Sequence, residues 1–193
     1  MKNSHYQYEK DLTEAVNCML NGGIILYPTD TVWGIGCDAT NHEAIKKVYR
    51  LKQREEKKSM LVLTDSLASL SKIVEDVPEI ALQLIEKSVN PLTIIYEKAH
   101  GVSSLILPSD GTLGIRITNE TFSKDLCRRL QRPMVSTSAN ISGEKTPATF
   151  NQISEEIKNG VDYIVNYRQN ENRNSRPSNI IKITARNIIT VIR

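Results

Sequence analysis

The sequence predicts an α/β layered domain in which helices alternate with about seven strands. Stretches with apolar residues at helical spacing alternate along the chain with short apolar runs, which is the pattern of such a domain. The chain has 193 residues, 39% hydrophobic and 24% charged, which suits one soluble domain with its own core. We therefore expect a single domain over residues 1–193.

The first predicted helix has apolar residues at helical spacing from Leu12 to Leu20 and stops at Gly22-Gly23. Thr40 and Glu43 form a capping-box pattern that begins a second helix, running to about Leu51. Further helices are predicted at 66–74, 78–88 and 121–130, and in a segment that ends near residue 158. The predicted strands are 23–27, 60–63, 92–96, 111–118, 133–136, 163–166, 179–184 and 188–192, with a shorter one near Leu105.

Several protein classes are disfavoured by the composition. Cys18, Cys37 and Cys127 are odd in number and form no CxxC pair, so neither a disulfide framework nor a zinc site is predicted, and we assign no metal ligands. No apolar run approaches the roughly 20 residues that span a bilayer, so no membrane association is expected. The first twelve residues are polar and charged, which argues against a secretory signal and favours a cytoplasmic location.

Basic residues concentrate between Lys46 and Lys58, where seven lysines and arginines face only Glu55 and Glu56. The whole chain has a net charge of only +3, so this local excess is the stronger feature. Such a stretch suits phosphate, either on a nucleotide or on RNA. A solvated helix face followed by a charged loop explains the same residues, and both interpretations stay open.

Three polar segments follow predicted strands or helices, where α/β domains usually bind ligands. Residues 27–38 combine hydroxyls, Asp30 and two glycines beside the single Trp33, and suit either a ligand loop or a tight turn. In residues 51–58, Lys52 and Arg54 are two apart, so they would project to one side of an extended segment. Residues 133–143 run from an apolar strand into hydroxyls, an amide and a glycine. No GxxxxGK[ST] loop occurs, which disfavours a P-loop nucleotide site.

Taken together, PTDTVWGIGCD at 28–38, LKQR at 51–54 and STSANISG at 136–143 resemble the YrdC/Sua5 family over nearly the whole chain. The resemblance implies a twisted, mostly mixed sheet with helices on both sides and a large concave basic face. It also implies synthesis of threonylcarbamoyl-AMP and pyrophosphate from L-threonine, bicarbonate and ATP, with Mg²⁺ held mainly by the ATP phosphates. Other proteins would then transfer the threonylcarbamoyl group to adenosine 37 of tRNA, and direct binding of tRNA or double-stranded RNA is a further option.

Site residues follow from the same resemblance, position by position. Lys52 and Arg54 match the pair that contacts the phosphates, and we expect them to act in catalysis. The matching nucleotide-binding positions are Lys52, Arg54, Lys58, Thr112, Ser138, Asn140, Thr146 and Arg193. The matching threonine-binding positions are Thr31, Arg116, Ser136 and Ser178, with Arg116 on the carboxylate.

The chain departs from the family pattern in loops. Glu55, Ser59 and Thr118 stand at or near places where the family favours proline, and residues 89–91 read VNP instead of PGP. These changes remove no charge or hydroxyl from the expected site. Since the chain ends at Arg193, we expect no additional C-terminal domain of the Sua5 type.

Two rival functions remain. A non-catalytic module that binds tRNA or double-stranded RNA would use the same basic stretch, but the sequence offers no aromatic platform for stacking bases. Carbamoyl-adenylate formation, as in a related hydrogenase-maturation domain, would require acylphosphatase and zinc-finger segments that the sequence lacks.

Overall fold

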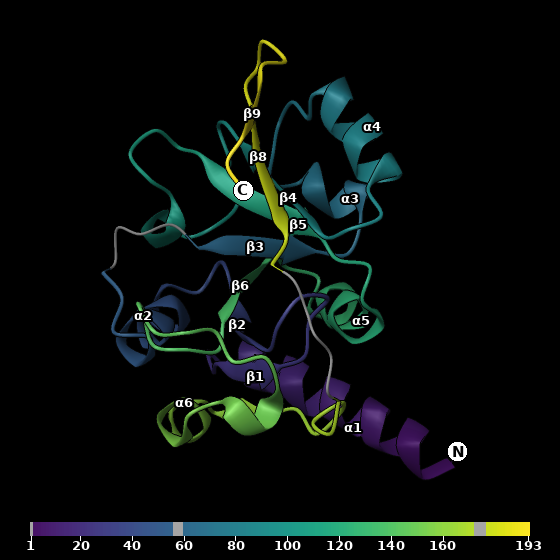
Figure 1. The fold of residues 1–193 in the computed structure, drawn as a ribbon, viewed down its shortest axis with the longest axis vertical. Helices are drawn as coiled ribbons and strands as arrows, with labels where there is room; N and C mark the ends of the chain where they lie inside the picture. The colour runs from purple at the N-terminus through teal and green to yellow at the C-terminus, as the bar shows by residue number, and fades with distance from the viewer. Residues whose placement is uncertain (1, 56–59, 172–176) are drawn as a thin grey trace.

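A computed structural model describes residues 2–55, 60–171 and 177–193. A single mixed sheet with the strand order β7-β1-β2-β6-β3-β5-β4-β8-β9 runs through the molecule (Figure 1). The pairs β1–β7, β3–β5 and β4–β8 are parallel, and the other neighbours are antiparallel. The strands are β1 (Ile25–Tyr27), β2 (Gly34–Asp38), β3 (Leu61–Thr64), β4 (Leu92–Tyr96), β5 (Leu113–Ile117), β6 (Met134–Ser138), β7 (Tyr163–Ile164), β8 (Asn179–Ile183) and β9 (Ile189–Val191).

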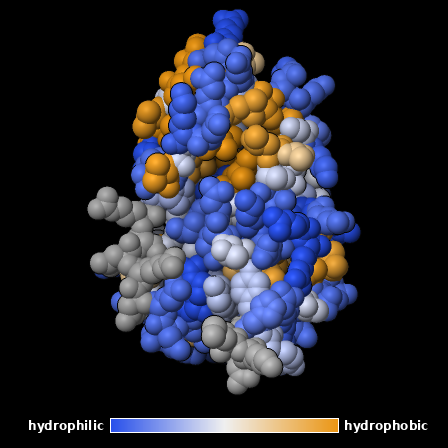
Figure 2. Space-filling model, turned by 90° about the vertical axis from the view of Figure 1, so that its right-hand side faces the viewer, coloured by the Kyte–Doolittle hydropathy of each residue, from blue (hydrophilic) through white to orange (hydrophobic). Residues whose placement is uncertain are grey.

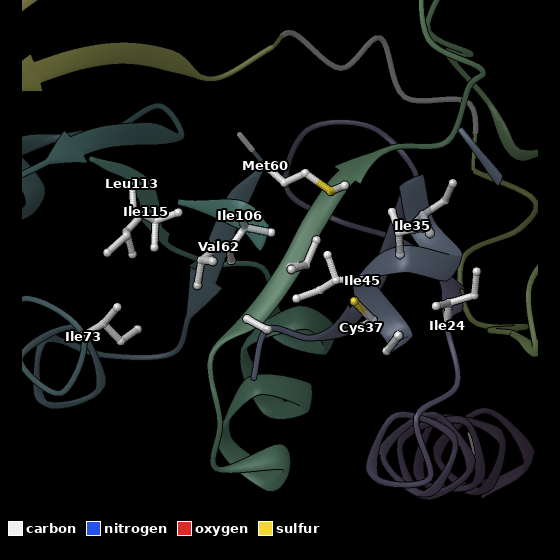
Figure 3. Close-up of a cluster of buried hydrophobic side chains, with 14 of the residues drawn as sticks. Ile24, Ile35, Cys37, Ile45, Met60, Val62, Ile73, Ile106, Leu113 and Ile115 are labelled. Atoms are coloured by element: carbon white, nitrogen blue, oxygen red, sulfur yellow. The ribbon is translucent and has the colours of Figure 1, made fainter. Parts of the chain in front are cut away.

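Helices cover both faces of this sheet, as predicted. The larger core lies between one face and α2, α3 and α4, and Figure 3 shows Ile45 of α2 beside Cys37 of β2 and Val62 of β3 beside Ile106. A second core fixes α1 and α5 against the other face through residues such as Leu63 and Met134. The helices are α1 (Lys2–Leu20), α2 (His42–Leu51), α3 (Leu67–Leu70), α4 (Glu79–Lys87), α5 (Thr121–Leu130) and α6 (Glu155–Gly160), with 3₁₀ turns η1 (Ser104–Ile106) and η2 (Phe150–Gln152).

The α/β class is confirmed, but the described residues form a sheet of nine strands where the sequence predicted about seven. Residues 34–38, which we had included in a ligand loop, form the fully buried strand β2. The strand predicted near Leu105 is wrong, because these residues form the 3₁₀ turn η1, capped by the Ser103 hydroxyl. The predicted capping box is also wrong: Asn41, not Thr40, caps α2 by accepting from the backbone amides of Glu43 and Ala44.

Coverage of the second face is uneven, and this asymmetry creates room for a site. The helices α1 and α5 pack on β1, β3 and β6 through that face. Toward β5, β4 and β8, the same face carries Gly114, Arg116, Thr93 and Ile180, which line a cavity instead of a helix interface. Alternation along each strand places Gly114 and Arg116 on the same side of the sheet.

Candidate functional site

The cavity on the open half of the sheet has a volume of about 420 Å³. Its floor comes from β4, β5 and β8, and its rim comes from the loop that leads into β2 and from the carboxyl end of β6. Nine of the predicted site residues line it: Arg54, Thr112, Ser138, Thr146, Arg193, Thr31, Arg116, Ser136 and Ser178. Segments far apart in the sequence therefore meet at one place, as the resemblance implied.

Three predicted residues stand apart from this group. Lys52 and Asn140 are not among the residues that line the cavity. Lys58 lies outside the described residues, as does Ser59.

The lining favours an anionic ligand with hydroxyl or phosphate groups. Arg54, Arg116 and Arg193 supply three guanidinium groups, and no Asp or Glu is among the described lining residues. Nine hydroxyl side chains complete the polar part of the lining: Thr29, Thr31, Thr93, Thr112, Ser136, Thr137, Ser138, Thr146 and Ser178. Arginine can bind two phosphate or carboxylate oxygens at once, and hydroxyls can add hydrogen bonds without adding charge.

Arg116 is held by a buried ion pair. Its Nη2 lies 3.0 Å from Oδ1 of Asp30, and the exposed fractions of the two side chains are only 3% and 13%. Burial raises the pKa of Asp30, while the Arg116 charge opposes that rise. Asp30 thus pairs with a cavity arginine. Trp33, three residues later, fills the core against Phe150 with ring centres 4.8 Å apart. Both interpretations of residues 27–38 therefore apply, because this segment is a packed turn and also contributes to the site.

The loop before β2 is stabilised by its own hydroxyls. Thr29 accepts a hydrogen bond at Oγ1 from the backbone N–H of Thr31 (3.0 Å) and donates one to the carbonyl of Val32 (2.6 Å). These bonds close within four residues and hold Thr31 at the cavity wall.

Two further hydroxyl pairs join separate strands at the cavity. The Tyr27 hydroxyl lies 2.6 Å from Ser136 Oγ, to which it donates, and Thr93 Oγ1 lies 3.0 Å from Ser178 Oγ. All four side chains are buried. Ser136 and Ser178 are therefore oriented by partners underneath the cavity surface.

Lys52 lies beneath the serine-rich loop, not in the cavity. Its side chain is 1% exposed, and Nζ donates to the carbonyls of Ser138 (2.5 Å) and Asn140 (2.6 Å). The Lys52 carbonyl in turn accepts from the backbone N–H of Ser142 at 2.9 Å. Burial lowers the pKa of Lys52 from 10.5 to about 8, and the nearby Arg54 charge adds to this effect. The ammonium group fixes the path of the loop that carries Ser138.

The prediction that Lys52 and Arg54 project to one side of an extended segment is wrong. Residues 49–54 form a Schellman turn, in which Gln53 N–H bonds the carbonyl of Arg50 and Arg54 N–H bonds that of Tyr49, both at 3.0 Å. Gln53 takes the left-handed conformation with φ of 48°. The turn sends Lys52 under the loop and leaves Arg54 at the cavity wall.

Other predicted positions have local partners. The Asn140 amide donates to the carbonyls of Ile141 and Glu144 and closes the loop after β6. Thr112 donates from Oγ1 to Asp110 at 2.7 Å, and Arg193 donates from Nε to the carbonyl of Ser178 at 3.3 Å.

The basic stretch divides between the two interpretations left open above. Lys46 pairs with Glu43 one helical turn away, and Lys47 contacts Asp162 and the Gly22 carbonyl, so both belong to a solvated helix face. Only Arg54, among the described residues of this stretch, lines the cavity.

Residues 168–171, the described part of the Asn- and Arg-rich segment, are attached to the site's framework. Arg168 pairs with Glu120 at 2.9 Å, and Glu120 also caps the amino end of α5 by accepting from the amides of Phe122 and Ser123. Residues 172–175, which complete that segment, lie outside the described residues.

In the part of the chain that the structure describes, no group of three or more His, Cys, Asp or Glu side chains could hold a metal ion. Over the same residues, no helix is both long and apolar enough to cross a membrane.

Sequence reasoning missed Thr93 and Gly114 as cavity residues, whereas Thr29 lies in the 27–38 segment already considered as a ligand loop. Thr93 had a usable signal, because it is a lone hydroxyl in the apolar strand LTIIY. Gly114 had no such signal, because nothing in the sequence distinguishes it from any other glycine within a strand.

A mixed sheet with an open half-face lined by arginines and hydroxyls defines an α/β protein that binds a small anionic ligand. The sequence family designated Sua5/YciO/YrdC, with the description "telomere recombination", matches residues 17–193. This chain belongs to that family.

Relatives of known name agree with this membership. The chain is 32% identical over 158 residues to the threonylcarbamoyl-AMP synthase of Idiomarina loihiensis, with 80% of this chain and 85% of that protein covered. It is 29% identical to the threonylcarbamoyl-AMP synthase of Pseudoalteromonas translucida over 175 residues, covering 89% and 92% respectively. The fold is similar to that of P. abyssi Sua5 complexed with L-threonine, with a TM-score of 0.85 and 24% identity. That match covers 94% of this chain and 53% of the Sua5 chain, so this chain spans about half of that protein.

Proposed function

We propose that this protein is an L-threonylcarbamoyladenylate synthase, which makes threonylcarbamoyl-AMP and pyrophosphate from L-threonine, bicarbonate and ATP. The observation that carries the proposal is the cavity with three arginines, nine hydroxyls and no acidic side chain among its described lining. Each substrate carries a negatively charged group at neutral pH: the phosphates of ATP, bicarbonate itself, and the carboxylate of zwitterionic threonine. The family members named above are threonylcarbamoyl-AMP synthases.

Arg116 is the residue that we assign to the threonine carboxylate. Its guanidinium is buried and oriented by Asp30, and Thr31, Ser136 and Ser178 provide hydroxyls in the same cavity. A related fold, that of P. abyssi Sua5, has been solved with L-threonine bound. Because the arginine is already oriented, little free energy is spent on ordering its side chain when a carboxylate binds, and this favours tight and specific binding.

Arg54 is the residue that we assign to the ATP phosphates. Thr112, Ser138, Thr146 and Arg193 line the same cavity and would contact other parts of the nucleotide. Lys52 has a different role in this proposal. It positions the loop of Ser138 through two backbone carbonyls, and Asn140 closes that loop.

The proposed chemistry needs no protein nucleophile. The threonine amine attacks CO₂ formed from bicarbonate and loses a proton, which gives a carbamate. A carbamate oxygen then attacks the α-phosphorus of ATP, the bond to the β-phosphate oxygen breaks, and pyrophosphate leaves with that electron pair. Arg54 stabilises negative charge that develops on the phosphates, and the cavity holds the two substrates in position.

In reaction class, this step is a nucleotidyl transfer. We propose that Mg²⁺ enters with ATP and is held mainly by phosphate oxygens, where it would neutralise part of their charge. The arginine- and hydroxyl-rich lining suits a nucleotide that brings its own cation, since it supplies no carboxylate in the described residues. The product would pass to other proteins that transfer the threonylcarbamoyl group to tRNA.

The rival function is a non-catalytic module for tRNA or double-stranded RNA. The names of the relatives favour the enzyme. Lys46 and Lys47 belong to the basic stretch that such a module would use, and here they contact Glu43 and the Gly22 carbonyl.

A pyrophosphate-release assay tests the proposal. Purified protein would receive ATP, Mg²⁺ and bicarbonate, with L-threonine, with L-serine, or with no amino acid. We expect release that depends on threonine and on bicarbonate, together with a product of the mass of threonylcarbamoyl-AMP. Pyrophosphate release at the same rate with and without threonine would overturn the proposal. So would the absence of release from a folded protein that binds RNA tightly.

A further inference from the structure

A second cavity of about 470 Å³ lies at the opposite ends of β3 and β6 from the candidate site. It is lined by Thr64 at the carboxyl end of β3 and Pro133 just before β6, whereas the first cavity is lined by Leu61 and Ser138 at the other ends of these strands. The two cavities share no lining residue. In Figure 1, α3 and α5 lie above and below the end of β3 where this second cavity opens.

Thr64 supplies a buried hydroxyl whose partner is missing from the described protein. Its side chain is 2% exposed, and Oγ1 has no hydrogen-bond partner among the described residues. The backbone at this position is satisfied, since the Thr64 carbonyl accepts from Thr118 N–H at 3.0 Å. Buried hydroxyls are nearly always hydrogen-bonded, and valine would fill the same volume without a polar atom. Thr64 lines the cavity, and its hydroxyl has no partner among the described residues that would compete with a bound molecule.

Three cations from different elements line the same cavity as Thr64: Lys72 after α3, Arg128 in the last turn of α5, and Arg132 before β6. Arg128 uses Nη1 for Asp125 at 3.1 Å, and Arg132 uses Nη1 for Asp38 at 2.6 Å. An arginine has five N–H donors, so most of each guanidinium fork stays available for a ligand.

Lys72 makes no ion pair with any described acidic residue, and Asp65 is the one carboxylate of the described lining. The helix dipole alone could explain a basic residue in the last turn of α5, such as Arg128. That explanation does not extend to Lys72 and Arg132, which lie outside the helix. Figure 2 views the molecule from this side and shows hydrophilic residues gathered over its lower half, where Figure 1 places α5 and α1.

The lining also offers groups that suit hydroxyls. Asp65 accepts from Ser69 Oγ at 2.6 Å through Oδ1, and its Oδ2 can accept a further hydrogen bond. Gln131 adds a side-chain amide to the lining. A volume of about 470 Å³ falls within the range of small-molecule sites. Three cations together with Thr64, Asp65 and Gln131 in one lining match a phosphate joined to a polyhydroxyl group.

We propose that this second cavity is a binding site for a small sugar phosphate, separate from the candidate threonylcarbamoyl-AMP site. Lys72, Arg128 and Arg132 bind the phosphate, and Thr64 and Asp65 bind hydroxyl groups of the sugar.

The test is calorimetric titration of the full chain with D-ribose 5-phosphate, with inorganic phosphate and with ribose. We expect ribose 5-phosphate to bind more tightly than phosphate, and ribose alone to give no detectable heat. Lys72→Gln should weaken ribose 5-phosphate binding at least fivefold and Thr64→Val at least threefold. Lys10→Gln, at an exposed position of α1 that lines neither cavity, is the matched control and should bind like the wild type.

A fourth variant separates the two cavities. Arg54→Gln should leave ribose 5-phosphate binding unchanged, because Arg54 lines only the first cavity. Lys72→Gln should in turn leave threonine-dependent pyrophosphate release unchanged. Loss of binding in Arg54→Gln would overturn the proposal, as would equal affinity for phosphate and ribose 5-phosphate. Unchanged binding in both Lys72→Gln and Thr64→Val would overturn it too, with an unaltered Tm showing that these variants fold.

Discussion

At the scale of single residues, Arg116 is the most buried of the three cavity arginines, and its position depends on Asp30. Arg116→Ala would leave the buried Asp30 carboxylate without its partner, and an uncompensated buried charge is strongly destabilising. The variant would therefore combine a loss of stability with any loss of threonine binding. A lysine keeps the charge but loses the planar fork that binds both oxygens of a carboxylate. The informative substitution is therefore Arg116→Lys.

We expect Arg116→Lys to raise the KM for threonine at least tenfold, a loss of about 1.4 kcal/mol, with a much smaller change in the KM for ATP. Steady-state pyrophosphate release with each substrate varied in turn measures both constants. Arg129→Lys, on the surface in a pair with Glu9, is the control. An unchanged threonine KM in a folded Arg116→Lys variant would contradict the carboxylate assignment.

Lys52 gives a second prediction at this scale, because it supports the loop from below. Lys52→Met keeps the length of the side chain and removes the donors to the Ser138 and Asn140 carbonyls. We expect kcat/KM to fall at least tenfold, about 1.4 kcal/mol, and hydrogen exchange of residues 138–142 to speed up even without ATP. Lys46→Met, on the exposed face of α2, should change neither quantity.

The exchange measurement distinguishes positioning from direct phosphate contact. If Lys52 acted only on bound phosphate, the loop of the ligand-free variant would exchange as in the wild type.

The lowered pKa of Lys52 gives a pH-dependent stability. Its folded pKa of about 8 lies below the usual 10.5, so between these values the folded state binds fewer protons than the unfolded state. The free energy of unfolding should therefore rise with pH across that window, by about 1–2 kcal/mol from this group between about pH 8 and pH 9.5. Urea unfolding of wild type and Lys52→Met at both pH values isolates the effect. A rise of the same size in both proteins would show that other groups cause it.

At the scale of elements, the turn after α2 shows what the sequence could and could not predict. The apolar runs and the match of motifs predicted most helices and strands and which segments line the cavity, whereas the capping box at Thr40 was wrong. The Schellman turn was missed because Gln53, not glycine, takes its left-handed position. Without a glycine there, the sequence predicted that Lys52 and Arg54 lie on the same side of an extended segment. The hydrogen bonds of the turn instead direct the two side chains to different places.

Glycines of β2 and β5 allow a matched pair of tests, since neither has an unusual backbone conformation. A methyl group on Gly36 would lie 2.9 Å from Cε1 of Tyr27, whose hydroxyl orients Ser136. On Gly114 it would meet Thr93 Cγ2 at 3.4 Å, an ordinary contact on the cavity floor.

We expect Gly36→Ala to lower the free energy of unfolding by about 1–3 kcal/mol, because Tyr27 is too closely packed to move freely. Gly114→Ala should keep its stability within about 0.5 kcal/mol and raise the KM of a substrate, since the methyl group occupies cavity space. Urea unfolding and substrate kinetics measure the two effects. Equal destabilisation by both variants would contradict the packing difference.

At the scale of the whole molecule, the cavity exists because α1 and α5 cover only one half of a long sheet face. Its arginines then come from three distant parts of the chain: the turn after α2, the middle of β5, and the end of the segment that follows β9. No local stretch of sequence could have indicated this convergence, which depends on the strand order. Arg54 and Arg193 approach the cavity from opposite halves of the sheet.

This convergence predicts energetic coupling between Arg54 and Arg193. If both bind the phosphates of one ATP molecule, Arg54→Gln alone should lower kcat/KM for ATP at least tenfold, and Arg193→Gln should lower it less. The double variant should deviate from the sum of the single effects by at least about 0.5 kcal/mol, because the remaining arginine must hold a ligand that has already shifted. Arg54→Gln combined with Arg129→Gln, which lies on the surface beside Glu9, should be additive within about 0.3 kcal/mol. Additivity of the Arg54 and Arg193 effects would show that the two arginines do not share a ligand, and Arg193 would then belong to the framework around Ser178 alone.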